Sequence, residues 1–203
     1  MSSREVARDD GSAVVLAMVV VLLLAAIAFA TATTTDIERM SASGEPNRLA
    51  VAYAADAALE RAMQELQAPP DWTAALNGGV TSALRESGAT MWGQSIDLAA
   101  ATTELQANTD AADARGADTT RWRLFLSGAL SAMVPDHPHD VLSYLVVWVG
   151  DDRAESDGNP FVDSNRTIRV HARALGPRDA RVDREALLRR DEDGGVVRVG
   201  EIR

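Results

Sequence analysis

The 203-residue sequence contains no cysteine and no lysine, and only 4% of its residues are aromatic. Without cysteine there are no disulfide bonds, so packing or a bound metal ion must hold the fold together. The low aromatic content predicts a modest, aliphatic core. Acidic residues outnumber arginines by 30 to 20, and the formal net charge is −10. An acidic chain disfavours binding to the nucleic-acid backbone, so we expect no nucleic-acid partner.

Catalytic signatures are also missing from the sequence. It has no cysteine nucleophile, no Gly-x-Ser-x-Gly turn and no glycine-rich phosphate loop. Only His137, His139 and His171 are available as histidine bases. We therefore expect a protein that is not an enzyme and that carries no certain cofactor.

An apolar run without charged residues extends from Ala13 to Ala32. About 20 predominantly apolar residues are needed to span a bilayer, so residues 12–35 are predicted to form a transmembrane helix. The hydrophobic region of a secretory signal peptide is shorter, about 7–15 residues. Small-x-small sequences at 28–30 and 30–32 nevertheless leave open ordinary cleavage by signal peptidase.

A second helical pattern follows the apolar run with little interruption. Five apolar residues recur at steps of three and four, which places them on one helical face: Ala52, Ala55, Leu59, Ala62 and Leu66. Pro69 and Pro70 end this pattern, because proline lacks the N–H that a helix needs. Residues 36–68 are therefore predicted to form the amphipathic continuation of the first helix.

Two segments of this N-terminal region resemble the PilX-type minor pilins of type IV pili. They are Glu38-Arg39-Met40, directly after the apolar run, and Ala54-Ala55-Asp56-Ala57-Ala58-Leu59 in the amphipathic helix. The resemblance extends to the related pseudopilins of type II secretion systems. It implies an α+β, pilin-like fold, in which a long N-terminal transmembrane and amphipathic helix packs on a C-terminal antiparallel β-sheet. It also implies a structural subunit that takes part in the initiation or tip assembly of a pilus or pseudopilus.

The resemblance further implies how the chain is processed. Residues 1–11 would be a leader peptide that prepilin peptidase removes between Gly11 and Ser12, and the new N-terminus would be methylated. The fifth mature residue is then Leu16, where most major pilins carry a glutamate. A subunit without this carboxylate is expected at the tip of the fibre, because it offers no charge to a neighbour's terminal amine.

Partners and location follow from the same resemblance. The expected partners are the membrane, other pilin or pseudopilin subunits contacted through the N-terminal helix, the prepilin peptidase and the inner-membrane assembly platform. The expected location is the bacterial inner membrane, as a single-pass protein with an extracytoplasmic head, and then the pilus or pseudopilus in the periplasm or at the cell surface. The alternative is a single-pass, membrane-anchored extracytoplasmic protein or enzyme of unknown activity.

Residues 69–203 are predicted to form the globular head, with an antiparallel sheet over about residues 121–203. Residues 144–149 are apolar at every position, as in a central strand that is covered on both faces. Residues 167–174 alternate apolar with basic residues, which predicts a half-exposed strand. Further strands are expected at 121–126, 181–189 and 196–202. Trp122, Leu124 and Leu126 are expected on one face of the first of these.

Oxygen-bearing side chains are dense between residues 151 and 165. Calcium prefers six to eight oxygen ligands in a flexible loop. The candidate ligands are Asp151, Asp152, Asp157, Asn159 and Asp163. The spacing differs from an EF-hand, and a solvated acidic loop is the alternative.

Two other polar groups have simple alternatives to a binding role. His137 and His139 stand beside Asp136 and Asp140 and can bind zinc or nickel, or they can belong to a surface turn. A series of arginines can form a positive face for an acidic partner, or it can pair with the interleaved acidic residues across strands. The series comprises Arg166, Arg169, Arg173, Arg178, Arg181, Arg184, Arg189 and Arg190.

Overall fold

The computed structural model describes residues 6–112, 119–133, 143–155 and 157–202. For residues 6–13, 27–46 and 202 it describes the secondary structure but not the side chains. The chain divides into two compact units, residues 1–46 and residues 47–203. Helix α1 (Val6–Glu65) contributes to both units, and each unit is described by itself.

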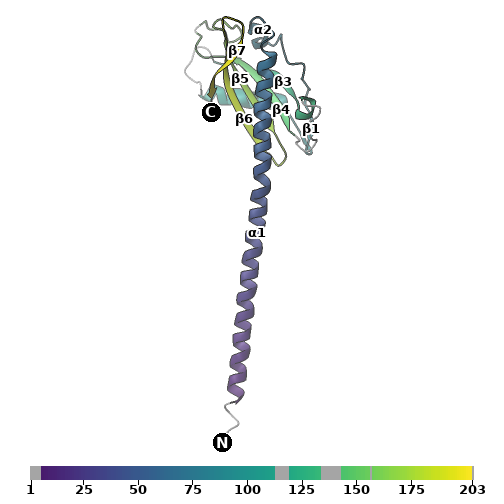
Figure 1. Cartoon of the computed structure of the whole chain (residues 1–203), viewed down its shortest axis with the longest axis vertical. Coiled ribbons are helices and arrows are strands. Elements are labelled where there is room, and N and C mark those ends of the chain that lie inside the picture. The colour runs from purple at the N-terminus through teal and green to yellow at the C-terminus, as the bar shows by residue number, and fades with distance from the viewer. Residues whose placement is uncertain (1–5, 113–118, 134–142, 156, 203) are drawn as a thin grey trace. The chain divides into compact units, whose positions relative to one another are not determined.

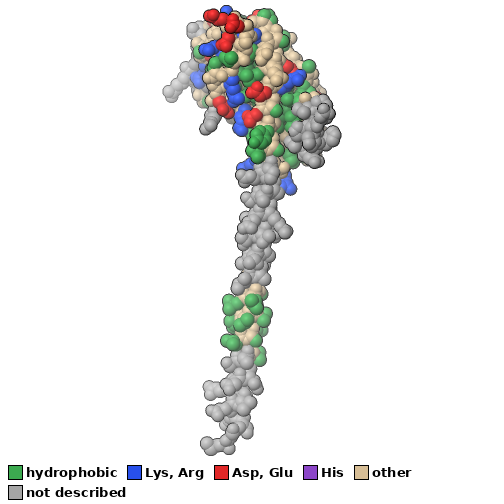
Figure 2. Space-filling view, in the orientation of Figure 1, with side chains coloured by type: hydrophobic (Ala, Val, Ile, Leu, Met, Phe, Trp, Pro, Cys, Tyr) green, Lys and Arg blue, Asp and Glu red, His purple; other side chains and the backbone are tan. Residues whose placement is uncertain are grey.

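The first unit is helical from Val6 onward and presents apolar side chains to the outside (Figures 1 and 2). The large apolar side chains from Val14 to Leu24 are 48–69% exposed. Among the described residues, no helix combines the length and the apolarity that a membrane crossing requires. The described apolar side chains cover only residues 14–26, fewer than the roughly 20 residues of a span. The predicted fold with a transmembrane helix over 12–35, and the inner-membrane location based on it, are therefore wrong for the described residues.

The second unit is an α+β structure built on a five-stranded antiparallel sheet (Figure 1). Its strands follow one another in chain order: β3 (Arg123–Ala129), β4 (Tyr144–Asp151), β5 (Thr167–Leu175), β6 (Arg181–Arg190) and β7 (Val196–Ile202). The smaller elements are α2 (Thr73–Leu76), the hairpin of β1 (Thr90–Met91) and β2 (Gln94–Ser95), α3 (Leu98–Ala112) and α4 (Leu130–Met133). Each strand pairs antiparallel with the next strand along the chain, so the sheet is a simple meander.

Residues 47–65 of α1 pack against one face of this sheet. Their buried side chains are mostly alanine, with Val51 and Leu59 among them, and they meet the apolar residues of β4, β5 and β6. Alanine brings the helix backbone close to the sheet. At Gly176, directly after β5, a Cβ atom would overlap the Val51 side chain. Four residues of the predicted apolar face are buried, namely Ala55, Leu59, Ala62 and Leu66, whereas Ala52 is only half-buried.

The C-terminal end of α1 is held by side chains from outside the helix. Trp72 Nε1 donates a hydrogen bond to the Leu66 carbonyl at 2.9 Å, and Arg190 Nη2 donates to the same oxygen at 2.8 Å. The Arg190 guanidinium also lies 4.9 Å from the centroid of the Trp72 ring. Since the last carbonyls of a helix have no partners within it, these donors satisfy a group that the helix leaves open.

The opposite face of the sheet is covered by α3. Its Leu98 and Leu105 pack with Trp122, Tyr144 and Trp148 in a second apolar cluster. Because α3 covers this face, β5 is buried at every position from Thr167 to Ala174, and the prediction of a half-exposed strand is wrong.

A change of register between Leu124 and Leu126 corrects a second expectation about the sheet. Trp122 and Leu124 belong to the cluster under α3, whereas Leu126 belongs to the cluster under α1. The three side chains therefore do not share one face, because the irregularity inserts an extra residue between them.

Candidate functional site

The acidic cluster begins where β4 ends. Asp151 is the last residue of β4, and Asp152 and Glu155 follow in the loop that leads to β5. All three are buried, with 1%, 5% and 7% of their surfaces exposed. One carboxylate oxygen from each lies within 4.8 Å of the others. Buried acidic groups at this separation repel one another unless a proton or a cation intervenes.

Most oxygens of the cluster accept hydrogen bonds from the loop itself. Glu155 accepts from the backbone N–H groups of Ser164 and Asn165, at 2.8 and 2.7 Å, and from the Ser164 hydroxyl at 2.7 Å. Asp152 Oδ1 accepts from Asn165 Nδ2 at 2.7 Å. These bonds fold the loop back on itself, so residues 152–155 and 164–165 lie side by side.

Asp151 differs from its neighbours because one of its oxygens has no such partner. Oδ1 accepts from the Asp152 N–H at 3.0 Å, whereas Oδ2 is buried without a hydrogen bond among the described residues. Burial, followed by the charge of Glu155, raises the pKa of Asp151 to about 8. Burial also raises the pKa of Asp163, against the lowering effect of backbone hydrogen bonds. At neutral pH the cluster therefore favours a bound proton or cation over a free Asp151 carboxylate.

The donor set suits a hard cation. Asp151, Asp152 and Glu155 offer only carboxylate oxygens, and calcium and magnesium bind through oxygen. The unpaired Oδ2 of Asp151 is a ready ligand atom, since binding a cation there disrupts no hydrogen bond. The buried cluster can thus hold a metal ion.

The structure brings together only some of the predicted calcium ligands. Asp151 and Asp152 lie in the cluster, and Asp163 is close enough for the charge of Glu155 to act on its pKa. Asp157 and Asn159 are exposed. They accept hydrogen bonds from backbone N–H groups two residues further on, as turn-forming residues do.

Glu155 is the member of the cluster that sequence reasoning missed. It lies in the same acidic run as Asp157, and nothing in the spacing separates the two. The difference arises because Ser164 and Asn165 return to cover Glu155, which a reading of local sequence does not show.

A second group of charged residues lies under α3, on β5 and β6. Arg169 Nε donates to Glu185 at 2.7 Å, and Arg173 Nε donates to Asp183 at 2.7 Å. His171 lies between these pairs, with its two ring nitrogens 3.0 Å from Asp183 and 3.3 Å from Glu185. Arginines of the predicted series therefore form cross-strand ion pairs, as the interleaved acidic residues indicated.

His171 is enclosed by aromatic rings as well as by charges. The rings of Trp122 and Trp148 lie edge-on to it, with centroids 5.7 and 5.8 Å away. Burial lowers the pKa of His171, but hydrogen bonds to Asp183 and Glu185 outweigh burial, and the net pKa is raised. The group stabilises the contact between β5 and β6, and both ring nitrogens of His171 are engaged by carboxylates.

Helix α3 is attached to this second group through hydrogen bonds. Trp122 Nε1 donates to Thr109 Oγ1 at 2.7 Å, and Trp148 Nε1 donates to Thr102 Oγ1 at 2.8 Å. The two threonines are seven residues, or about two helical turns, apart, so both face the sheet from the same side of α3.

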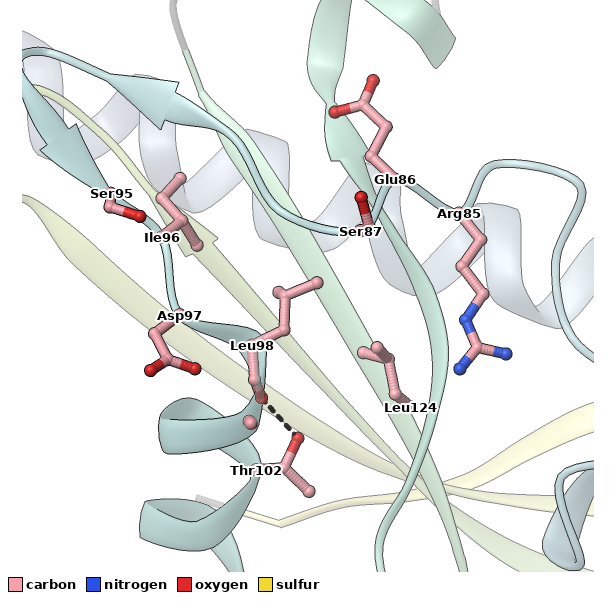
Figure 3. Close-up of a pocket in the computed structure, with 10 residues that line it drawn as sticks. Arg85, Glu86, Ser87, Ser95, Ile96, Asp97, Leu98, Thr102 and Leu124 are labelled. Carbon is pink, nitrogen blue, oxygen red and sulfur yellow. Dashed lines mark hydrogen bonds between the residues drawn. The ribbon is translucent and has the colours of Figure 1, made fainter.

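A cavity of about 700 Å³ opens beside the N-terminus of α3 (Figure 3). Leu98 and Leu124 line it together with the polar residues Arg85, Ser87 and Asp97. Asp97 Oδ1 already accepts from the Ala100 N–H at 2.9 Å and so caps the helix. The lining thus combines one arginine with two carboxylates, Glu86 and Asp97, and with hydroxyl groups.

The remaining candidate residues have a simpler outcome. His137 and His139 lie outside the described residues. Gly11 and Ser12 lie within α1, and Leu16 is 69% exposed. Cleavage between Gly11 and Ser12 stays a prediction.

Comparisons with known proteins find no matching family model, no matching curated protein and no matching solved structure.

Proposed function

We propose that the protein is a pilin-like structural subunit that takes part in the initiation or tip assembly of a type IV pilus or a type II secretion pseudopilus. The observation that carries this proposal is the exposed apolar surface of α1. The large side chains from Val14 to Leu24 are 48–69% exposed, and the segment contains no charged residue. A helix that is apolar on all sides is normally buried, so a partner must cover it.

The proposed partners are the equivalent helices of other pilin or pseudopilin subunits. An uncharged helix rich in valine and leucine is matched best by another apolar helix, because no polar group is then left unpaired. The head is consistent with a subunit that is carried by its N-terminal helix, because residues 47–65 of α1 pack against the sheet. Within the second unit, Leu49 and Tyr53 of α1 are also exposed, at 55% and 66%.

Photo-crosslinking in the native host tests this proposal. A photoreactive residue at Val20 should capture other fibre subunits, whereas the same residue at Glu192, an exposed turn position of the head, should not. Crosslinking at Val20 to lipid alone, without any subunit, would reject the proposal.

Processing by prepilin peptidase is the second test. Mass spectrometry of the purified mature protein should find Ser12 at the N-terminus, with a methyl group, and Gly11→Val should block the cut. An N-terminus near residue 31 would instead indicate ordinary secretion.

Leu16 supports a place at the tip. A fifth mature residue without a carboxylate cannot neutralise the terminal amine of a subunit above it, so this subunit should be assembled first. Deletion should then reduce the number of fibres more than their length, as counted by electron microscopy. Immunogold label spread along the fibre shaft would contradict the tip position.

We further propose that calcium occupies the acidic cluster of the head. The oxygen-only donor set and the unpaired Oδ2 of Asp151 support this choice over zinc, which favours nitrogen and sulfur. Added calcium should raise the melting temperature, because a ligand bound only to the native state stabilises it. Asp151→Asn and Glu155→Gln should abolish the rise, and Asp157→Asn, at an exposed turn, should retain it. A rise that survives in Asp151→Asn would place the ion elsewhere.

A further inference from the structure

The loop between β4 and β5 contains a short sequence that the acidic cluster does not account for. Asn165-Arg166-Thr167 is an asparagine, then a residue other than proline, then a threonine. This is the acceptor pattern of asparagine-linked glycosylation. The sequence has four other asparagines, and none of them is followed at that distance by serine or threonine: Asn47, Asn77, Asn108 and Asn159.

Asn165 lies on the surface of the head. Ser164, Asn165 and Arg166 are exposed one after another, directly before β5 begins at Thr167. An attached sugar is bulky and hydrophilic, so it must remain in water, and glycosylated asparagines accordingly lie in surface loops. The structure therefore provides the environment that the sequence pattern requires.

The carboxamide of Asn165 keeps a hydrogen that the reaction can replace. A carboxamide nitrogen carries two hydrogens. Nδ2 donates one of them to Asp152 Oδ1 at 2.7 Å, and the carboxamide makes no other hydrogen bond among the described residues. A sugar that replaces the second hydrogen leaves one for Asp152. The bond between Asn165 and the acidic cluster is thus compatible with the modified side chain.

Thr167 supplies the hydroxyl of the pattern, and the fold does not use this hydroxyl. Thr109 and Thr120 are buried like Thr167, and their hydroxyls donate to main-chain carbonyls at 3.0 and 2.9 Å. Thr167 donates to Asp163 Oδ1 through its main-chain N–H, which residues other than proline also carry. Its hydroxyl has no hydrogen bond among the described residues. Since the hydroxyls of buried residues normally have a partner, recognition outside the folded state explains this threonine better than a contact within it.

The folded loop also indicates when the sugar is attached. The main-chain N–H of Asn165 donates to Glu155 at 2.7 Å, and Thr167 is only 9% exposed. A transferase that recognises the asparagine and the hydroxyl together needs access to both. It must therefore act on the chain before this loop closes.

We propose that Asn165 is a site of N-glycosylation. The co-substrate is a sugar with a phosphate leaving group on its anomeric carbon, and a transferase of the host supplies the active site. Nδ2 of Asn165 attacks the anomeric carbon, and the new carbon–nitrogen bond replaces the bond from that carbon to the phosphate oxygen. The phosphate leaves with the electron pair of the broken bond, and the nitrogen loses one proton. This modification goes beyond the proposed function and depends neither on entry into a fibre nor on calcium in the acidic cluster.

Mass spectrometry of the protein purified from its native host tests the proposal. The proteolytic fragment that contains Asn165 should carry the additional mass of one or more sugars, and electron-transfer fragmentation should locate this mass on Asn165. A single sugar would indicate a nucleotide sugar as the donor, and a larger unit would indicate a preassembled oligosaccharide. A fragment without additional mass would overturn the proposal, as would additional mass on a residue other than Asn165.

Three replacements show whether the modification depends on the acceptor pattern. Thr167→Val keeps the shape of threonine without its hydroxyl, so the additional mass should be lost, whereas Thr167→Ser should retain it. Asn159→Gln changes an exposed asparagine of the same loop that lacks the pattern, and it should also retain the additional mass. Because the fragment is weighed after digestion, the result does not depend on how stably each variant folds. Additional mass that persists in Thr167→Val, or that disappears in Asn159→Gln, would contradict the assignment.

Discussion

Replacing Asp151 with asparagine should make the metal-free protein more stable at neutral pH. Asparagine keeps an oxygen that can accept from the Asp152 N–H, as Oδ1 of Asp151 does now. It removes a carboxyl group whose pKa is raised by burial beside Glu155, so that the folded chain holds a proton that the unfolded chain releases at neutral pH. A loss of one acidic side chain from the interior is therefore expected to stabilise the fold rather than weaken it.

The size of the effect follows from the two pKa values of Asp151. The pKa is about 8 in the fold, against an ordinary value of 3.8. At pH 7 the unfolded chain has released this proton while the folded chain retains it. The interval of roughly three pH units between pH 7 and the ordinary pKa therefore favours unfolding by about 4 kcal/mol. Water entering the loop reduces this penalty, so we expect Asp151→Asn to gain about 2–4 kcal/mol.

The pH dependence gives the sign of the effect. Stability that depends on protonated Asp151 is fully present below pH 3.8 and is lost as the pH rises toward 8. The advantage of Asp151→Asn should therefore grow over this window and shrink below about 1 kcal/mol near pH 4. Urea denaturation of both proteins with a chelator, between pH 4 and pH 8, measures the difference. Equal stabilities at pH 7, or an advantage that does not change with pH, would refute the reasoning.

Three further changes test other parts of the fold. His171→Gln should be most destabilising below pH 6.5 and less so at alkaline pH. The reason is that the raised pKa of His171 gives stability that is lost as the proton leaves; urea denaturation at several pH values measures the difference in stability. Arg190→Gln removes hydrogen bonds to the last carbonyls of α1 and should cost about 1–3 kcal/mol in denaturant titrations, whereas Arg189→Gln, with a side chain 56% exposed, should cost less than about 0.5 kcal/mol. Gly176→Ala should cost about 1–3 kcal/mol by overlap with Val51, and the double variant with Val51→Ala should recover part of that loss; thermal melting shows whether it does.

The sheet was predictable from local sequence where the pattern was unambiguous. The unbroken apolar run in β4 indicated a strand covered on both faces, and β4 is buried at all eight positions. The alternation of apolar and basic residues in β5 predicted the strand correctly, but it did not predict that the basic side chains are buried. Arg169, His171 and Arg173 suggested solvent, yet they are buried because α3 covers them and because Asp183 and Glu185 lie opposite. The partners of a charged side chain come from other segments, so its burial is a tertiary property.

The acidic cluster was predictable in place but not in membership. The density of oxygen ligands after β4 pointed to the right loop, and Asp151 and Asp152 are in the cluster. Asp157 and Asn159 are absorbed by local turns, whereas Glu155 is buried by Ser164 and Asn165 from nine and ten residues further on. The irregularity in β3 was equally hidden, since no glycine or proline marks it between Leu124 and Leu126.

The attachment of α1 to the sheet has a mechanical consequence. The helix is buried against the strands from Val51 to Leu66, its Asp56 pairs with Arg184 of β6 at 3.1 Å, and its far end is bonded to Arg190 and Trp72. A pull along the axis of this segment must slide all of these contacts at once, as in shear, rather than peel them apart one by one. Tension on α1 is thus shared by all the contacts between the helix and the sheet, and it reaches β6 at Arg184 and at Arg190. This arrangement keeps the head attached to its helix under load.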